Sequence, residues 1–155
     1  MLPEERKFAV DTNVFIRAYR DPGFNAALNR FHSAFAPFEY LSAVVAQELR
    51  AGMQSAQHRA RLERVVLEVY SRRGRVLTPS RQAWSESGNV LAEMAWREGL
   101  EVGKVSKAFG NDVLLALSCR EAGVVLVTDN VRDFGRIQRY VQFEYTAPWP
   151  EATAE

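Results

Sequence analysis

The stretch Phe8-Ala9-Val10-Asp11-Thr12-Asn13 decides the fold that we expect for this chain. A short apolar run that ends at a carboxylate and two further polar residues is typical of a buried parallel strand. The stretch Val124-Val125-Leu126-Val127-Thr128-Asp129-Asn130 repeats this pattern with a β-branched run. Because α/β proteins place ligands beyond the carboxyl ends of parallel strands, we expect Asp11 and Asp129 to lie at the same edge of one sheet.

The rest of the chain has the apolar spacing of helices, interrupted by short strand-like segments. Ser42 and Ser80 stand where helices begin and can cap them, and Gly123 can end another. This alternation predicts an α/β fold with a parallel sheet and helices on both faces. The predicted helices span residues 14–20, 25–35, 42–52, 57–70, 80–99, 111–122 and 131–140, and the predicted short strands span 40–41, 75–77 and 141–145.

The bulk composition fits a single packed domain. The chain has 155 residues, of which 47% are hydrophobic and 25% are charged. We expect one domain over residues 1–147 and a disordered tail over residues 148–155. The net charge is +1, so an anionic partner must be held by a local patch and not by the field of the whole protein.

The residues that the sequence lacks exclude several kinds of site. Cys119 is the only cysteine, which excludes an internal disulfide and a thiolate metal cluster. His32 and His58 are the only histidines and do not have the spacing of a zinc site. The first ten residues lack the apolar segment of a signal peptide, and no apolar run approaches the ~20 residues that cross a bilayer. We therefore expect a cytoplasmic protein with no membrane partner.

Two more acids, Glu48 and Asp112, stand in otherwise apolar helical stretches. Each acid has a structural alternative: Asp112 can be a first-turn acid that complements the helix dipole, and Glu48 can be a solvated residue on a helix flank. Asp11 and Asp129 can be turn residues that follow strands. Several carboxylates at one sheet edge, however, repel one another and require a cation, and hard oxygen ligands select Mg²⁺ or Mn²⁺. Such an ion promotes hydrolysis of a phosphodiester without a histidine base.

Four motifs follow one another along the chain: VDTNVFI at residues 10–16, SAVVAQELRAG at 42–52, NDVLLA at 111–116 and VTDNVRDF at 127–134. In this order and in these predicted elements they resemble the PIN-domain nucleases, and most closely the VapC-type ribonuclease toxins of prokaryotic toxin–antitoxin pairs. No single motif is specific, but together they cover nearly the whole chain. The resemblance implies a PIN-like three-layer sandwich with a central, mostly parallel sheet.

The resemblance implies metal-binding and catalytic roles for the acids. Asp11, Glu48 and Asp112 match the three residues that hold the divalent ion of the family, Mg²⁺ or Mn²⁺. The fourth position is open between Asp129 and Asn130, because the family usually has Asp or Asn two residues after the strand-end threonine. We take Asp129 as the fourth catalytic and metal-binding residue in the working assignment.

The neighbouring polar residues are expected to support these acids. Asn13, Thr128 and Asn130 are candidates for orienting the carboxylates, with simple turn hydrogen bonding as the alternative for the first two. Asp133 matches a further family acid for which we expect a structural role.

A basic stretch and two apolar helices are candidates for binding partners. Residues 57–82 hold seven arginines against two acids, which suits either phosphate binding or a solvated helix face. The helices predicted at 14–20 and 25–35 carry more large apolar side chains than one core face needs. Core packing explains most of these side chains, and a partner groove is the alternative. The resemblance implies an antitoxin that covers such a region and a toxin that forms a homodimer.

The working hypothesis is a divalent-metal-dependent endoribonuclease that hydrolyses RNA phosphodiesters as the toxin of a type II toxin–antitoxin pair. One alternative is a PIN-domain nuclease that acts in RNA processing or repair outside such a pair. Another is a non-catalytic nucleic-acid-binding module of the same fold.

Overall fold

The computed structural model describes residues 6–150 and contains a five-stranded sheet in which all neighbouring strands run parallel. The strand order is β3-β2-β1-β4-β5, so β1 lies at the centre. This arrangement confirms the predicted α/β fold. The strands are β1 (Lys7–Val10), β2 (Glu39–Ser42), β3 (Val76–Leu77), β4 (Val124–Val127) and β5 (Tyr145–Thr146).

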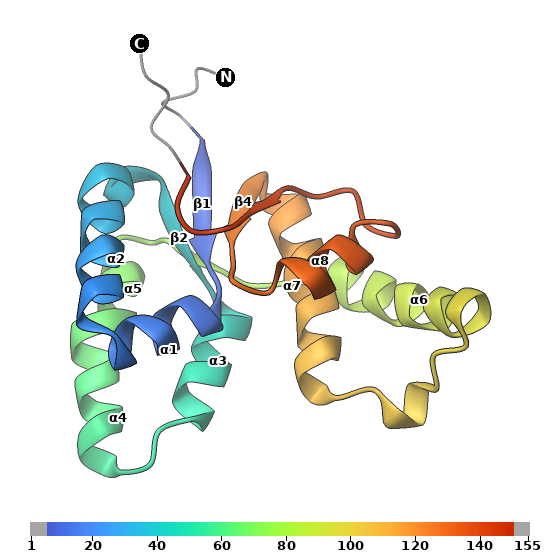
Figure 1. Cartoon of the computed structure of the whole chain (residues 1–155), viewed down its shortest axis with the longest axis horizontal. Coiled ribbons are helices and arrows are strands. Elements are labelled where there is room, and N and C mark those ends of the chain that lie inside the picture. The colour runs from blue at the N-terminus through green and yellow to red at the C-terminus, as the bar shows by residue number, and fades with distance from the viewer. Residues whose placement is uncertain (1–5, 151–155) are drawn as a thin grey trace.

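Helices flank the strands on both sides (Figure 1). The first half of the chain supplies α1 to α5, and the second half supplies α6 to α8. The helices are α1 (Thr12–Arg20), α2 (Pro22–Phe35), η2 (Ala36–Phe38), α3 (Ala43–Ala51), α4 (Ala56–Leu62), η3 (Glu63–Leu67), α5 (Glu68–Arg72), α6 (Arg81–Glu98), η4 (Val102–Lys104), α7 (Lys107–Ala122) and α8 (Val131–Ile137).

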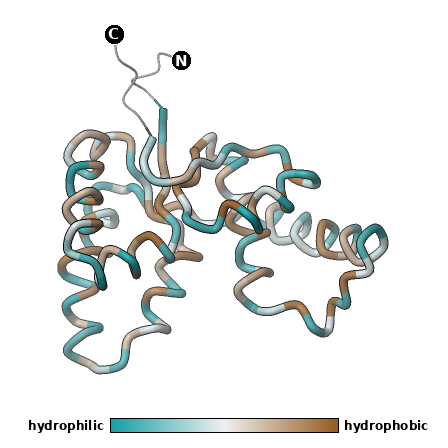
Figure 2. The backbone as a smooth tube through the Cα atoms, viewed as in Figure 1, coloured by the Kyte–Doolittle hydropathy of each residue, from teal (hydrophilic) through white to brown (hydrophobic). Residues whose placement is uncertain are grey.

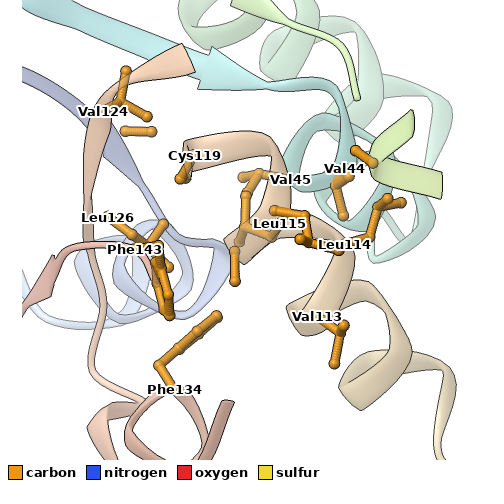
Figure 3. Close-up of a cluster of buried hydrophobic side chains, with 14 of the residues drawn as sticks. Val44, Val45, Val113, Leu114, Leu115, Cys119, Val124, Leu126, Phe134 and Phe143 are labelled. Carbon is orange, nitrogen blue, oxygen red and sulfur yellow. The ribbon is translucent and has the colours of Figure 1, made fainter. Parts of the chain in front are cut away.

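The central strands bury alternate side chains in two separate cores. Phe8 and Val10 of β1 pack in a cluster with residues of α1 and α2. Ala9, which lies between them, packs on the other face in a larger cluster with α3 and α7. In this second core, Val44 and Val45 lie beside the central residues of α7 (Figure 3). The period of two along β1 therefore produces the three layers of the sandwich.

The register of the sheet sets the position of the site. Val10 of β1 pairs with Val127 of β4, and the N–H of Asp11 donates to the carbonyl oxygen of Val127 at 2.9 Å. The next residues along each strand, Asp11 and Thr128, therefore lie side by side at the carboxyl edge of the sheet.

Two predicted element boundaries are wrong by four residues, more than any of the others. Helix α7 begins at Lys107 with Ser106 as its cap, four residues before the predicted start. Asp112 is thus in the second turn, and the predicted interaction of its charge with the helix dipole at the first turn does not apply. The last strand is Tyr145–Thr146, whereas residues 141–144 lie outside any strand.

The end of the chain was expected to form a disordered tail over residues 148–155. Trp149 instead stacks on Phe31 with ring centroids 5.4 Å apart, and it also contacts Phe24 of α2 at 5.2 Å. Residues 151–155 of the expected tail, and residues 1–5 of the expected domain, lie outside the described residues.

Hydrophobic and hydrophilic segments alternate along the helices (Figure 2). Within residues 6–150, no helix is both long enough and apolar enough to cross a membrane.

Candidate metal centre

Asp11 lies where β1 ends and α1 begins, and only 3% of its surface is exposed. The Thr128 hydroxyl donates to Asp11 Oδ2 at 2.8 Å, and the Asn13 amide donates to the same oxygen at 3.2 Å. Asp11 Oδ1 accepts the backbone N–H of Thr12 at 2.8 Å and thereby caps α1. Both oxygens of this buried carboxylate are therefore held by donors from β4 and α1.

Glu48 reaches the same edge from α3. Ser42 ends β2, and its hydroxyl accepts the N–H of Val44 at 3.1 Å, so α3 starts directly where the strand stops. The Thr12 hydroxyl donates to Glu48 Oε1 at 2.9 Å. This hydrogen bond joins α1 to α3 one residue after Asp11.

Asp112 of α7 is joined to Asp133 of α8 through one amide. The side-chain amide of Asn130 donates to Asp112 Oδ2 at 3.4 Å and to Asp133 Oδ2 at 3.1 Å. The backbone N–H of Asn130 donates to the Thr128 hydroxyl at 2.9 Å, which links this group back to Asp11. We call Asp11, Glu48, Asp112 and Asp133 the carboxylate cluster.

Burial and mutual repulsion raise two pKa values in the carboxylate cluster. Loss of hydration raises the pKa of Asp11 from 3.8 to about 6, against the lowering effect of its hydrogen bonds from Thr128 and Thr12. Burial, followed by the charges of Asp11, Glu48 and Asp133, raises the pKa of Asp112 from 3.8 to about 8. Without a cation, the Asp112 carboxyl therefore gives up its proton at a higher pH than an exposed aspartate does.

Asp129 is not brought into this cluster, in contrast to the working assignment. Its carboxylate accepts a hydrogen bond from Arg17 Nη1 at 3.1 Å and is 30% exposed. Its backbone N–H donates to Asn13 Oδ1 at 3.1 Å, which fixes the turn after β4. The geometry thus favours Asn130 and Asp133 over Asp129 as the fourth member of the site.

The donor set suits a hard divalent cation. The cluster offers only oxygen donors, and the mutual repulsion of its carboxylates is relieved when a cation binds. Among residues 6–150, no three side chains of the His, Cys, Asp and Glu types already converge as a ready-made ligand group. Thr12 donates to one oxygen of Glu48 and Asn130 donates to one oxygen of Asp112, which leaves the second oxygen of each carboxylate for an ion.

Sequence reasoning missed two residues of this site. The Thr12 hydroxyl was not a candidate, although Thr12 directly follows Asp11 at the start of a helix. Asp133 was expected to have a structural role, although its spacing from Asn130 is one turn of α8. Asn13, Thr128 and Asn130 do contact carboxylates of the cluster, as their predicted orienting role requires.

An α/β sandwich with acids from the end of β1 and from α3, α7 and α8 at the carboxyl edge of its parallel sheet is the kind of domain that the sequence motifs predicted. Residues 8–140 match the PIN domain family, and the chain belongs to this family. Two proteins of Haemophilus influenzae, named Ribonuclease VapC2 and Ribonuclease VapC, are each 26% identical to it over 131 residues. The matches cover 84% of this chain and 92% of each relative.

Solved structures of VapBC and FitAcB contain chains with the same fold. DNA-bound VapBC from Salmonella typhimurium has a chain that is 27% identical, with a TM-score of 0.68, covering 92% of this chain and 98% of that one. FitAcB from Neisseria gonorrhoeae matches at 21% identity with a TM-score of 0.66, over 93% of this chain and 99% of that one. The second likeness bears on the fold alone.

Proposed function

We propose that this chain is a divalent-metal-dependent endoribonuclease and the toxin of a type II toxin–antitoxin pair. The observation that supports this proposal most strongly is the carboxylate cluster, in which burial and like charges raise the pKa of Asp112 to about 8. Membership of the PIN domain family and similarity to proteins named ribonuclease VapC support RNA as the substrate.

Asp11, Glu48 and Asp112 would hold Mg²⁺ or Mn²⁺, and Asp133 or Asn130 would be the fourth residue at the metal site. The ion supplies Lewis-acid activation of water and of the phosphodiester. Thr128 and Asn13 donate hydrogen bonds that orient the Asp11 carboxylate, and Thr12 donates one that orients the Glu48 carboxylate.

The exposed face of α1 supports an antitoxin partner. Val14 of α1 is buried, in agreement with core packing, but Ile16 is 41% exposed and Tyr19 is 79% exposed on the same helix. Exposed large apolar residues of this kind are typical of partner surfaces. The similar structure from Salmonella typhimurium is a VapBC complex. By the same resemblance we propose a homodimer that acts in the cytoplasm.

Cleavage of total RNA tests the enzymatic part of the proposal. We expect purified protein to fragment RNA with Mg²⁺ or Mn²⁺ and to leave it intact with a chelator. Asp11→Asn should lower the rate by more than ~100-fold, because even partners of metal ligands contribute about 10–100-fold. Its circular dichroism spectrum should stay native, since Asn has the same shape as the protonated Asp. Full activity in this variant would overturn the assignment of the site.

Two observations separate this proposal from its alternatives. Copurification with a small protein encoded in a neighbouring reading frame supports the toxin role, and its absence favours a processing or repair nuclease. Titration of Mg²⁺ into the protein by calorimetry separates an enzyme from a metal-free binding module. A protein that binds RNA but gives no heat with Mg²⁺ or Mn²⁺ would be such a module.

A further inference from the structure

A hollow lined with arginines opens next to the carboxylate cluster. Its walls include Arg132 and Arg136 of α8 and Arg139 in the turn that follows this helix. Asn130 and Asp133 also line it. These two residues belong to the hydrogen-bonded group that contains Asp112, so the hollow and the carboxylate cluster are continuous.

The arginines of the hollow differ in how they are held. Arg136 Nε donates to Glu98 Oε1 at 3.3 Å, and its guanidinium lies over the Phe109 ring at 5.3 Å. Arg132 and Arg139 are exposed and form no ion pair within residues 6–150. Arg136 therefore has a fixed position, whereas the other two guanidinium groups are available to an anionic ligand.

An RNA strand that reaches the carboxylate cluster needs positive charge beside it. The cluster itself carries several negative charges, and the scissile phosphate is flanked by further phosphates along the strand. With a net charge of only +1, the protein provides no general attraction to offset this repulsion. Guanidinium groups at the rim of the site provide such an attraction locally, and their planar donors suit phosphate oxygens.

We propose that this hollow binds the phosphates next to the scissile bond of the RNA strand, with Arg132 and Arg139 as the contacting residues. The inference rests on the proposed ribonuclease function. Glu98 holds Arg136 in the wall of the hollow and also accepts the Tyr140 hydroxyl at 2.9 Å.

The arginine-rich stretch of residues 57–82 is the competing surface for RNA. Glu68 pairs with Arg72 at 2.8 Å, and Glu63 of this stretch is engaged by Arg50 at 2.6 Å. Most of the stretch lies on α4, η3 and α5, on the other side of the sheet strands from α8 in Figure 1. No residue of the stretch lines the hollow beside the carboxylate cluster.

The test measures the affinity for a short fluorescein-labelled, single-stranded RNA of mixed sequence by anisotropy. Every protein carries Asp11→Asn so that the probe stays intact, and each titration is repeated between about 50 and 200 mM salt. We expect Arg132→Gln with Arg139→Gln to weaken binding about tenfold or more. The slope of log K against log salt should fall by roughly 1.4, or about 0.7 for each lost phosphate contact.

Arg20→Gln with Arg30→Gln is the matched control, because it removes the same charge from two exposed arginines of α1 and α2. This pair should leave the affinity and the salt slope unchanged. An equal loss in both pairs, or no loss in the Arg132 and Arg139 pair, overturns the inference. A loss confined to Arg61→Gln with Arg64→Gln overturns it in favour of the 57–82 stretch.

The two proposals fail in different ways. If the protein with Asp11 intact does not cleave RNA, the ribonuclease function itself is wrong. If it cleaves RNA but the Arg132 and Arg139 changes leave its KM for RNA and the binding of the inactive protein unaltered, only the role of the hollow is wrong.

Discussion

Asp129 and Asp133 are four residues apart, but their carboxylates face different neighbours. The backbone of Asp129 is bound to Asn13, and its side chain extends toward Arg17. Asp133 lies in the first turn of α8, on the side of Asn130, because three residues make nearly one helical turn. The first turn of α8 therefore places Asp133, and not Asp129, where it can act with Asp112.

This geometry predicts that Asp133→Asn is more damaging than Asp129→Asn. Removing the Asp133 carboxylate should lower RNA cleavage about 10–100-fold and raise the Mg²⁺ concentration for half-maximal activity. Asp129→Asn removes an exposed pair with Arg17, so its effect should stay within about threefold. Rates measured over a Mg²⁺ titration decide the matter, and a larger loss in Asp129→Asn would restore that residue as the fourth ligand.

At the scale of elements, the apolar pattern predicted most strands and helices, and hydrogen bonds set the ends that it missed. The sequence leaves residues 101–110 open between a loop and a short helix, so the helix predicted at 111–122 does not include residues 107–110. The Ser106 hydroxyl accepts the N–H of Phe109 at 3.1 Å and starts α7 there. The alternation over 141–145 resembled a strand, but only the last of these residues joins β4.

Three elements meet at Glu39, the first residue of β2, which is 3% exposed. The Tyr70 hydroxyl of α5 donates to Glu39 Oε1 at 2.8 Å, and His32 of α2 lies 2.7 Å from Glu39 Oε2. Burial and the Glu39 charge raise the pKa of the Tyr70 hydroxyl well above its usual range. This network joins α2, β2 and α5 at the amino-terminal end of the strand, away from the carboxylate cluster.

We predict that Tyr70→Phe destabilises the protein without affecting catalysis. The change leaves a buried carboxylate with one donor fewer, which costs about 1–3 kcal/mol. Urea denaturation should show this loss in the free energy of unfolding, whereas the rate of RNA cleavage below the transition should match that of the unmodified protein. A stability within ~0.3 kcal/mol of the original would show that the network contributes little.

At the scale of the whole molecule, the sheet concentrates its acids at one edge and makes stability depend on pH. The folded-state pKa values of Asp112 and Asp11, about 8 and about 6, lie above the unfolded value of 3.8. At pH values between 3.8 and about 8, the folded state therefore binds more protons than the unfolded state. The stability from these two groups is present below about pH 4 and is lost as pH rises through 6 and then 8.

The metal-free protein should therefore melt at a lower temperature at pH 8 than at pH 5. Asp112→Asn removes the larger of the two contributions and should raise the melting temperature at pH 8 by at least ~2–4 °C, about 1 kcal/mol. Mg²⁺ should stabilise the original protein at pH 8 but have less effect on the variant. Scanning fluorimetry with a chelator and with Mg²⁺ measures both. If the melting temperatures of the original protein and of Asp112→Asn changed with pH in the same way, the predicted link between Asp112 and the pH dependence of stability would be wrong.

The resemblance to PIN-domain nucleases predicted three of the four acids in the cluster, Asp11, Glu48 and Asp112, whereas their apolar context alone left a structural alternative open for each. The positions of these acids relative to one another could not be predicted from the sequence, because they depend on the register of β1 with β4 and on the turn after Thr128. The arginines of the hollow were likewise hidden, because single charges on a short helix do not reveal what lies beside them.

The central strand β1 ends at Val10 and pairs with β4, which begins only at Val124. Asp11 thus gains its Thr128 donor, and Asp112 its Asn130 donor, only after the ribosome has made residues 124–130. Under the proposed function, a chain that stops before residue 128 should lack both hydrogen bonds and should therefore cleave no RNA.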